Sequence, residues 1–300
     1  MSSEFSNAIA SGRSLKRSQF SPKTLFSNLM TGVAFACAIL ALIPLIAVLF
    51  YVVVNGAARL GPQLFTQLPP PPYQPTSPQF QTGGFGNALV GTLMTVGIAT
   101  VISIPFGILA AIFLSEFARG TQLARWINFF TNVLSGVPSI VMGVFAYSWI
   151  VLSTKSYSAM AAGVALAVLM LPTIVRTATE ALEAIPSELR QAAVGLGATR
   201  YQTVLKVVLP AAIPAIVTGV MLAVARAAGE TAPVLFTALF NNYWNWDVWK
   251  PTATLSVLVF NFAVTPYQNW QQLAWSAALV LVAMVLITNI LSRWIIQRQR

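Results

Sequence analysis

The chain has 300 residues, of which 57% are hydrophobic and only 8% are charged, whereas about 25% of the residues of a soluble domain are charged. This composition excludes an ordinary soluble domain and predicts an all-α membrane protein in contact with lipid. The formal net charge of +10 does not indicate nucleic acid binding, because the Lys and Arg residues are scattered singly between long uncharged runs.

Several kinds of chemistry are excluded by residues that the sequence lacks. It contains no histidine and one cysteine, Cys37, so the chain offers neither a Cys/His metal site nor histidine acid–base chemistry. The phosphate-binding pattern GxxxxGK[ST] is also absent. We therefore expect no catalytic residue, no metal and no cofactor in this chain. If ATP drives its work, a separate subunit binds and hydrolyses it.

Long uncharged runs divide the sequence into spans, since a helix needs about 20 apolar residues to cross a bilayer. Residues 1–28 are Ser-rich and basic and cannot bury a core, so they are predicted to be a tail that ends in a short interfacial helix. The next run is too long for the apolar part of a signal peptide and is expected to remain as the first span. The six predicted spans are residues 29–54, 85–115, 126–152, 158–175, 211–240 and 273–292.

Some apolar segments carry signals of bending or of incomplete crossing. Pro44 is expected to kink the first span, and Pro138 to bend the third. The apolar run 253–264 is too short to cross and is predicted to be a re-entrant or surface helix. Aromatic residues in 241–252 predict a belt at headgroup depth, with a docking surface for an external binding protein as the alternative.

The basic residues predict the topology, because cytoplasmic connections carry an excess of Lys and Arg. With six spans and both termini in the cytoplasm, only four of the 17 Lys and Arg residues lie elsewhere: Arg59, Lys155 and Lys250 outside, and Arg226 within a span. The expected cytoplasmic parts are residues 1–28, the short turn with Arg119 and Arg125, residues 176–209, and 294–300 with Arg293 at the end of the last span. The expected external parts are the Pro-rich loop 55–84, the turn around Lys155 and the aromatic segment 241–272.

The connection 176–209 carries the densest charge, and its first half predicts a short helix. Pro186 fits the first position of a helix that ends near Val194. Gly195 and Gly197 are expected to end it, since both can take left-handed backbone angles.

The second half of this connection predicts another helix. Thr199 and Gln202 match the capping box T-x-x-Q, and Pro210 is expected to close the helix that follows. A helix–turn–helix with an apolar tip suits docking into the groove of another protein. An ordinary amphipathic connection between spans would show the same pattern.

Two charges in the fifth span mark a candidate solute path. Arg226 lies roughly 24 Å along the helix from Pro210, where a charge costs at least about 2.5–3.5 kcal/mol. Glu230 follows at i+4 and is expected on the same helix face. They could bind an oxyanion, or they could be a self-neutralising pair that lets the helix pack. Arg176 is either the inner mouth of the path or an anchor on the cytoplasmic side.

The spacing over residues 191–210 resembles the EAA loop of importer-type ABC transporter permeases. That pattern is Glu-Ala-Ala, three residues, Gly, nine residues and Ile-x-Leu-Pro, and this chain has Gln191 and Val207 in place of Glu and Ile. The resemblance implies a cytoplasmic coupling helix between spans 4 and 5 that docks on an ATPase subunit. The residues expected at this contact are Gln191, Ala192, Ala193, Gly195, Gly197, Tyr201, Leu209 and Pro210.

Three further segments, 136–141, 171–176 and 225–233, resemble the permeases of the phosphate-specific ABC importer. They resemble its PstA-type more than its PstC-type permease, because Gly-Glu-Thr is followed by Ala-Pro. The resemblance covers residues 85–293 and implies a six-span permease domain over 29–293. It implies roles in phosphate passage for Arg226 first, then for Glu230 and Arg176, with Thr231 in the same motif.

The function implied by this resemblance is a bacterial inner-membrane permease subunit that takes up inorganic phosphate and is not itself an enzyme. Its expected partners are a PstC-type second permease, a PstB-type ATPase dimer that holds ATP and Mg, and an external PstS-type phosphate-binding protein. A permease for another oxyanion or small solute is the first alternative. A stand-alone channel or membrane scaffold is the second.

Overall fold

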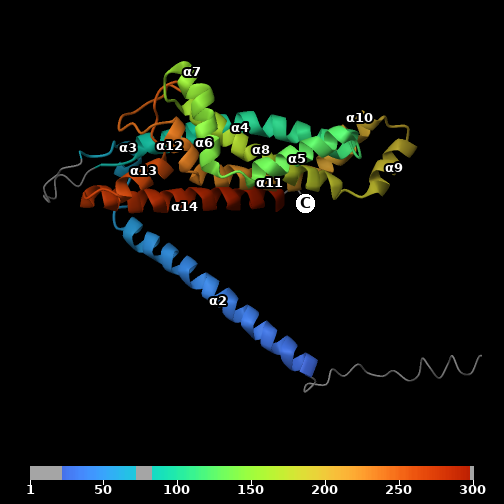
Figure 1. Ribbon diagram of the computed structural model, residues 1–300, viewed down its shortest axis with the longest axis horizontal. Coiled ribbons are helices and arrows are strands. Elements are labelled where there is room, and N and C mark those ends of the chain that lie inside the picture. The colour runs from blue at the N-terminus through green and yellow to red at the C-terminus, as the bar shows by residue number, and fades with distance from the viewer. Residues whose placement is uncertain (1–21, 72–82, 298–300) are drawn as a thin grey trace, which may run out of the picture. The chain divides into compact units, whose positions relative to one another are not determined.

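Helices make up all the regular structure of residues 22–71 and 83–297, which are the parts of the chain that the computed structural model describes (Figure 1). The all-α class predicted from the apolar runs is confirmed. Within these residues, five helices are long and apolar enough to cross a membrane, or six if one bent pair counts as a single span. The chain forms two units, residues 1–51 and 52–300.

The first unit contains most of α2 (Pro22–Ala57), which is longer at both ends than the predicted span 29–54. Pro22 is tolerated at the start because the first helical residues need no N–H partner. Pro44 lies inside α2 without ending it. Residues 1–21 of the predicted tail 1–28 lie outside the described residues, and residues 22–28 form the first part of α2.

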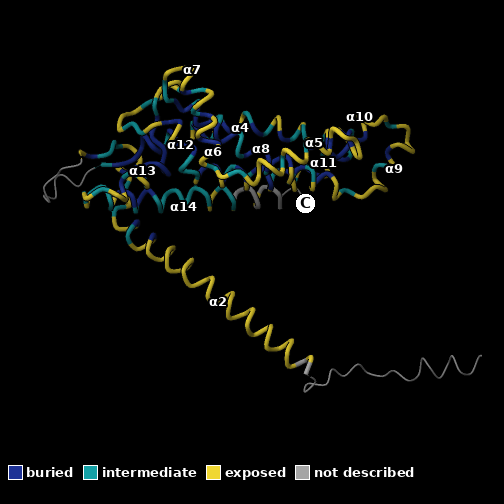
Figure 2. Tube along the Cα trace, in the orientation of Figure 1, coloured by how far each residue is buried: buried dark blue, intermediate teal, exposed yellow. Residues whose placement is uncertain are grey.

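The centre of the second unit is formed by α4 (Gly86–Ile112), α8 (Ala159–Glu183) and α11 (Leu209–Gly229). Small residues let these helices approach closely, as is typical of membrane helices. A Cβ added at Gly107 would lie 2.6 Å from Ile174, and one at Gly163 would lie 2.5 Å from Ile98. Figure 2 shows buried stretches along these helices and exposed residues around α9 (Ser187–Gly195) and α10 (Arg200–Thr203).

The predicted third span is broken rather than gently bent. The helix α5 (Gln122–Gly136) and the stretch from Ser139 to Thr154, which contains α6 (Ser139–Ala146), η3 (Tyr147–Val151) and α7 (Leu152–Thr154), meet at 103°. Val137 is extended because the ring of Pro138 disfavours the helical conformation of the residue before it. The sequence predicted only a bend at Pro138, whereas the structure has a complete break between two helices.

The fourth and sixth predicted spans are confirmed as helices, but each is longer than predicted. The helix α8 begins after Ser158, whose side chain accepts a hydrogen bond from the Ala161 N–H, and continues past Arg176 to Glu183. The last helix, α14, covers Gln268–Gln297.

The predicted fifth span, 211–240, is interrupted. Its first part, α11, ends at Gly229, Glu230 is extended, and a short helix, α12 (Ala232–Thr237), follows. The run 253–264 forms α13 (Leu255–Ala263), whose first residues are buried against α4 and α14, so it is not a surface helix. Figure 1 shows α9 and α10 at one end of the bundle and α3 (Gln63–Thr66), α12 and α13 toward the other.

Candidate functional site

The predicted helix–turn–helix is present between α8 and α11. Pro186 caps α9 instead of occupying its first helical position, and Glu188 lies in the first turn. Gly195 is the last residue of α9 and does not have a positive φ, so the prediction that it leaves the helix in a left-handed conformation was wrong. Gly197 does take that conformation, with φ of 88°.

The capping box predicted at Thr199 is confirmed in both halves. The Thr199 side chain accepts a hydrogen bond from the Gln202 N–H, and the Gln202 side chain accepts one from the Thr199 N–H. The helix then passes through a π-helical stretch, η4 (Val204–Val208), directly into α11. Pro210 therefore does not close this helix; it is the second residue of α11 and directly follows the π-helical stretch, where the regular backbone bonding is already altered.

The predicted coupling residues differ in exposure. Tyr201 is 68% exposed, and Leu196, which lies between the two glycines and was not predicted as a contact, is 90% exposed; they are the most exposed large hydrophobic side chains of this loop. Ala193 is buried and Leu209 packs against the core, so these two act as supports for the loop. The remaining predicted contact residues are exposed: Gln191, Ala192, Gly195, Gly197 and Pro210.

An ion pair that the sequence did not predict attaches this loop to the far end of α4. Glu116 lies in the π-helical turn η2 (Phe113–Phe117) that continues α4, and its side chain is 8% exposed. Arg190 of α9 approaches it with Nη2 2.8 Å from Oε1 and Nε 3.4 Å from Oε2. The two residues are 74 positions apart, and the sequence gives no pairing signal, although the single acid at the end of an apolar run marks Glu116 as unusual.

Arg226 and Glu230 lie together, as predicted. The Arg226 Nε atom is 3.5 Å from Glu230 Oε1, and the two side chains are 62% and 16% exposed. Both line an open cleft of about 590 Å³ between α11 and α14. Asn289 of α14 lines the same cleft and was not predicted; a polar amide inside an otherwise apolar span is the signal that could have identified it.

The backbone break beside this cleft is held in place by α13. The Ser256 hydroxyl donates to the Glu230 carbonyl oxygen at 2.9 Å, and the Glu230 N–H donates to the Ala227 carbonyl. Thr231 is half-buried at the break. Irregular backbone at membrane depth is tolerated where it lines a cavity or is buried in protein, so the break and the charged pair mark one site.

Arg176 is not among the residues that line this cleft. It forms an exposed pair with Glu180, with Nε 3.1 Å from Oε1. Its neighbour Thr177 packs against Gly219, which lies seven residues before Arg226 on α11. Arg176 is therefore separated from Arg226 by roughly 10 Å along the bundle axis, toward the end that carries α9 and α10.

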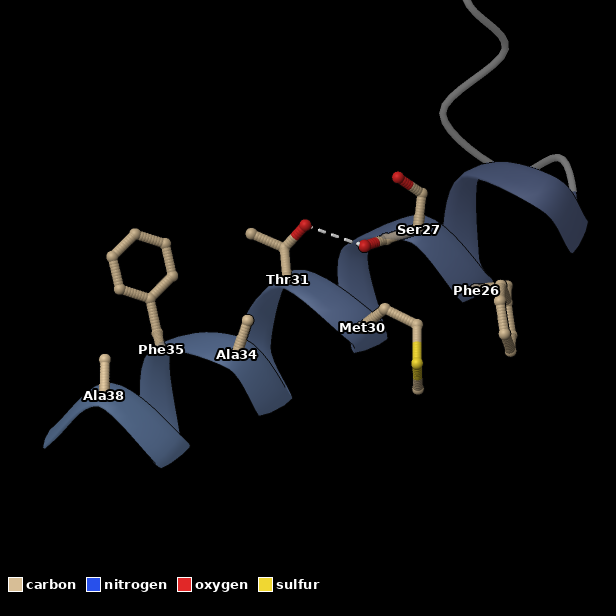
Figure 3. Close-up of a pocket in the computed structure, with 7 residues that line it drawn as sticks. All are labelled: Phe26, Ser27, Met30, Thr31, Ala34, Phe35 and Ala38. Carbon is tan, nitrogen blue, oxygen red and sulfur yellow. Dashed lines mark hydrogen bonds between the residues drawn. The ribbon is translucent and has the colours of Figure 1, made fainter. Parts of the chain in front are cut away.

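A hollow along α2 is not a candidate site. Its seven lining residues, from Phe26 to Ala38, belong to one helix, and Figure 3 shows them along a single stretch of it. The drawn hydrogen bond runs from the Thr31 hydroxyl to the Ser27 carbonyl of the same helix. The surface is that of one apolar helix and brings no charged groups together.

A broken helical bundle with a charged cleft and a protruding helix–turn–helix is the architecture of a transport permease, and the comparison with known families agrees. The model of the family described as binding-protein-dependent transport system inner membrane component matches residues 103–300. The chain belongs to this family and is a multi-pass inner-membrane transport subunit that works with other proteins of such a system.

Two relatives that match most of this chain share the same name, phosphate transport system permease protein PstA. The chain is 38% identical over 274 residues to the phosphate transport system permease protein PstA of Haemophilus influenzae, covering 91% of this chain and 95% of that protein. It is 38% identical over 256 residues to the protein of the same name from Yersinia pestis, covering 85% of each.

Solved structures support the same fold. The MetNI methionine ABC transporter in inward-facing conformations has a chain that aligns with a TM-score of 0.60 at 21% identity, covering 70% of this chain and 94% of that chain. A bacterial alginate ABC transporter has one that aligns with a TM-score of 0.62 at 15% identity, covering 93% and 99%.

Proposed function

We propose that the chain is the permease subunit of an ATP-driven ABC importer that moves inorganic phosphate across the inner membrane. The observation that carries this proposal is the cleft in which Arg226, Glu230 and Asn289 lie together beside the break after α11. Similarity to proteins named as phosphate transport permeases favours phosphate among the oxyanions that such a cleft could accept.

The three side chains suit a protonated oxyanion. The Arg226 guanidinium is largely exposed and can donate two parallel hydrogen bonds to phosphate oxygens. Glu230 can accept a hydrogen bond from a P–OH group, whereas it would repel an anion that carries no proton. The Asn289 amide can donate or accept. Phosphate retains at least one proton near neutral pH and sulfate does not, so this arrangement favours phosphate.

The transport pathway requires more than this chain. One arginine is too little charge to hold a dianion, so a PstC-type second permease completes the path. An external PstS-type binding protein delivers phosphate, and Arg176 lies on the route toward the cytoplasm. The chain itself binds no cofactor, and ATP and Mg bind to the partner ATPase. In this arrangement the chain has six spans and both termini in the cytoplasm.

Energy reaches the spans through the loop of α9 and α10. Its exposed apolar tip, Leu196 and Tyr201, seats in a groove of a PstB-type ATPase dimer. Closure of the dimer on ATP pushes the loop and shifts the spans between inward-facing and outward-facing states.

The experiment that tests this function is reconstitution of the chain with candidate partner proteins from the same genome in proteoliposomes. ATP-dependent uptake of radiolabelled phosphate is expected, with little competition by sulfate, molybdate or a phosphonate. Uptake inhibited equally by sulfate would identify a general oxyanion permease. Solute flux without any ATPase subunit would identify a channel and overturn the proposal.

A further inference from the structure

The cytoplasmic end of α4 contains a buried acid whose charge is not used by the solute cleft. Glu116 sits in η2, a π-helical turn, and is one of few charged residues with a buried side chain in the part of the chain that the structure describes. A buried carboxylate is costly unless it is paired and hydrogen-bonded. The groups that satisfy it come from the coupling loop.

Arg190 makes four hydrogen bonds that link three elements. Besides its two bonds to Glu116, its Nη2 donates to the Leu182 carbonyl at 2.8 Å and its Nη1 donates to the Ile185 carbonyl at 2.5 Å. Leu182 belongs to the last turn of α8 and Ile185 to the turn after it, and the Leu182 carbonyl also accepts the Ile185 N–H. A single guanidinium on α9 therefore joins the ends of α4 and α8.

A second set of contacts joins the other half of the loop to the same turn. Arg200 of α10 donates to the Glu116 carbonyl oxygen, and its guanidinium carbon lies 5.2 Å from the centre of the Phe117 ring. The Tyr201 ring lies 5.1 Å from the Phe117 ring. Both helices of the loop thus contact η2.

We infer that Glu116 and Arg190 are positioning residues that make α9, α10 and the cytoplasmic ends of α4 and α8 move as one body. This inference rests on the proposed function of the loop as the part that an ATPase pushes. The loop is covalently joined only to α8 and α11. The ion pair therefore also connects α4 to the helices that move when an ATPase displaces the loop. Because α4 packs along α8, motion of the loop is carried toward the solute cleft through packed helices.

Distances between spin labels test the inference without reference to the solute. Labels at Arg119→Cys, after η2, and Ser187→Cys, at the start of α9, would be placed in a Cys37→Ser background and measured by electron paramagnetic resonance. We expect one narrow distance distribution that stays the same in ATP-free and ATP-trapped complexes, and a broad one in Glu116→Gln. Equal widths with and without the Glu116 carboxylate would overturn the inference.

Transport by the assembled complex gives the second readout. Glu116→Gln should lower uptake about tenfold, the order expected for lost charge-assisted hydrogen bonds, while ATPase binding and ATP hydrolysis persist. Glu183→Gln, an exposed acid at the end of α8, is the matched control and should transport normally. Arg190→Lys keeps the charge but cannot make all four bonds, so it should give an intermediate loss.

The outcomes separate this inference from the proposed function. Normal uptake by Glu116→Gln, or loss of the ATPase subunit from its complex, would overturn the positioning role. Absence of phosphate uptake by the unmodified complex would overturn the proposed function, while the label distances would still decide whether Glu116 holds the loop.

Discussion

The Nε atom of Arg226 lies 3.5 Å from Oε1 of Glu230, although the helix that carries Arg226 ends one residue before Glu230. The pairing therefore does not come from helical i,i+4 geometry alone. It depends on the extended backbone at Glu230, which the Ser256 hydroxyl holds from the neighbouring α13. The arginine remains largely exposed while the glutamate is mostly buried, so the arginine is the group that a solute meets first.

Replacing Glu230 by Gln should change selectivity more than assembly. The amide keeps the shape but removes the negative charge, so an anion without a proton is no longer repelled. We expect phosphate uptake to fall about tenfold and sulfate to become a competitor. Labelled phosphate uptake with and without sulfate measures both effects. Glu183→Gln, which removes an exposed acid at the end of α8, is the control. Unchanged selectivity in Glu230→Gln would contradict the role of the carboxylate.

Replacing Asn289 by Leu should modestly reduce phosphate uptake. The substitution keeps the size of the side chain and removes a neutral hydrogen-bonding group, which contributes about 0.5–1.5 kcal/mol, or a two- to tenfold effect. The concentration dependence of uptake is the measurement. Thr288→Val is the matched control, because the Thr288 hydroxyl is bonded to the Met284 carbonyl of its own helix. Equal behaviour of the two variants would remove Asn289 from the site.

Gly197→Ala should disturb the coupling loop through its backbone. Gly197 has φ of 88°, a conformation that costs an alanine about 1 kcal/mol or more, and no atom lies near the position of an added Cβ. We expect weaker ATPase binding in co-purification. Gly97→Ala, on α4 and outside the loop, has the same free space without the positive φ and should bind normally. Identical binding by both variants would show that the turn geometry is not needed.

Gly91→Ala should destabilise the bundle. A Cβ at Gly91 would collide with the Ala253 carbonyl in the buried segment before α13, and backbone cannot move aside as a flexible side chain can. Overpacking of this kind costs about 1–3 kcal/mol. Gly97→Ala on the same helix meets no atom and should stabilise α4 by about 0.5–1 kcal/mol. Thermal unfolding in detergent distinguishes the two variants. A lower unfolding midpoint for the Gly97 variant would contradict the open space beside Gly97.

The parts of the fold that the sequence predicted are those governed by local rules. Apolar length identified the helices, and the capping box at Thr199 and the left-handed turn at Gly197 follow from side-chain chemistry within a few residues. The Arg226–Glu230 pair was found because charges are rare in apolar spans. Each of these signals lies within one short stretch of sequence.

The parts that could not be predicted depend on distant contacts. Pro138 breaks the helix locally, but the 103° angle between the two halves places α6 against α12, where Gly143 meets Pro233, and that contact lies far along the chain. The extended backbone at Glu230 depends on Ser256, and the partner of Arg190 lies 74 residues away. No single-sequence pattern encodes such pairings, because one chain shows no correlation between positions.

Phosphate uptake by an Arg226→Ala variant, in a reconstituted complex whose assembly is verified by co-purification, tests the central claim most directly. The alanine removes the forked donor while its neighbours Ala225 and Ala227 remain buried in the packing of α11. ATP-dependent phosphate uptake is expected to fall at least about tenfold, with partial recovery in Arg226→Lys, and with subunit stoichiometry unchanged. Uptake equal to that of the unmodified complex would show that the cleft of Arg226 and Glu230 is not the path that the solute takes.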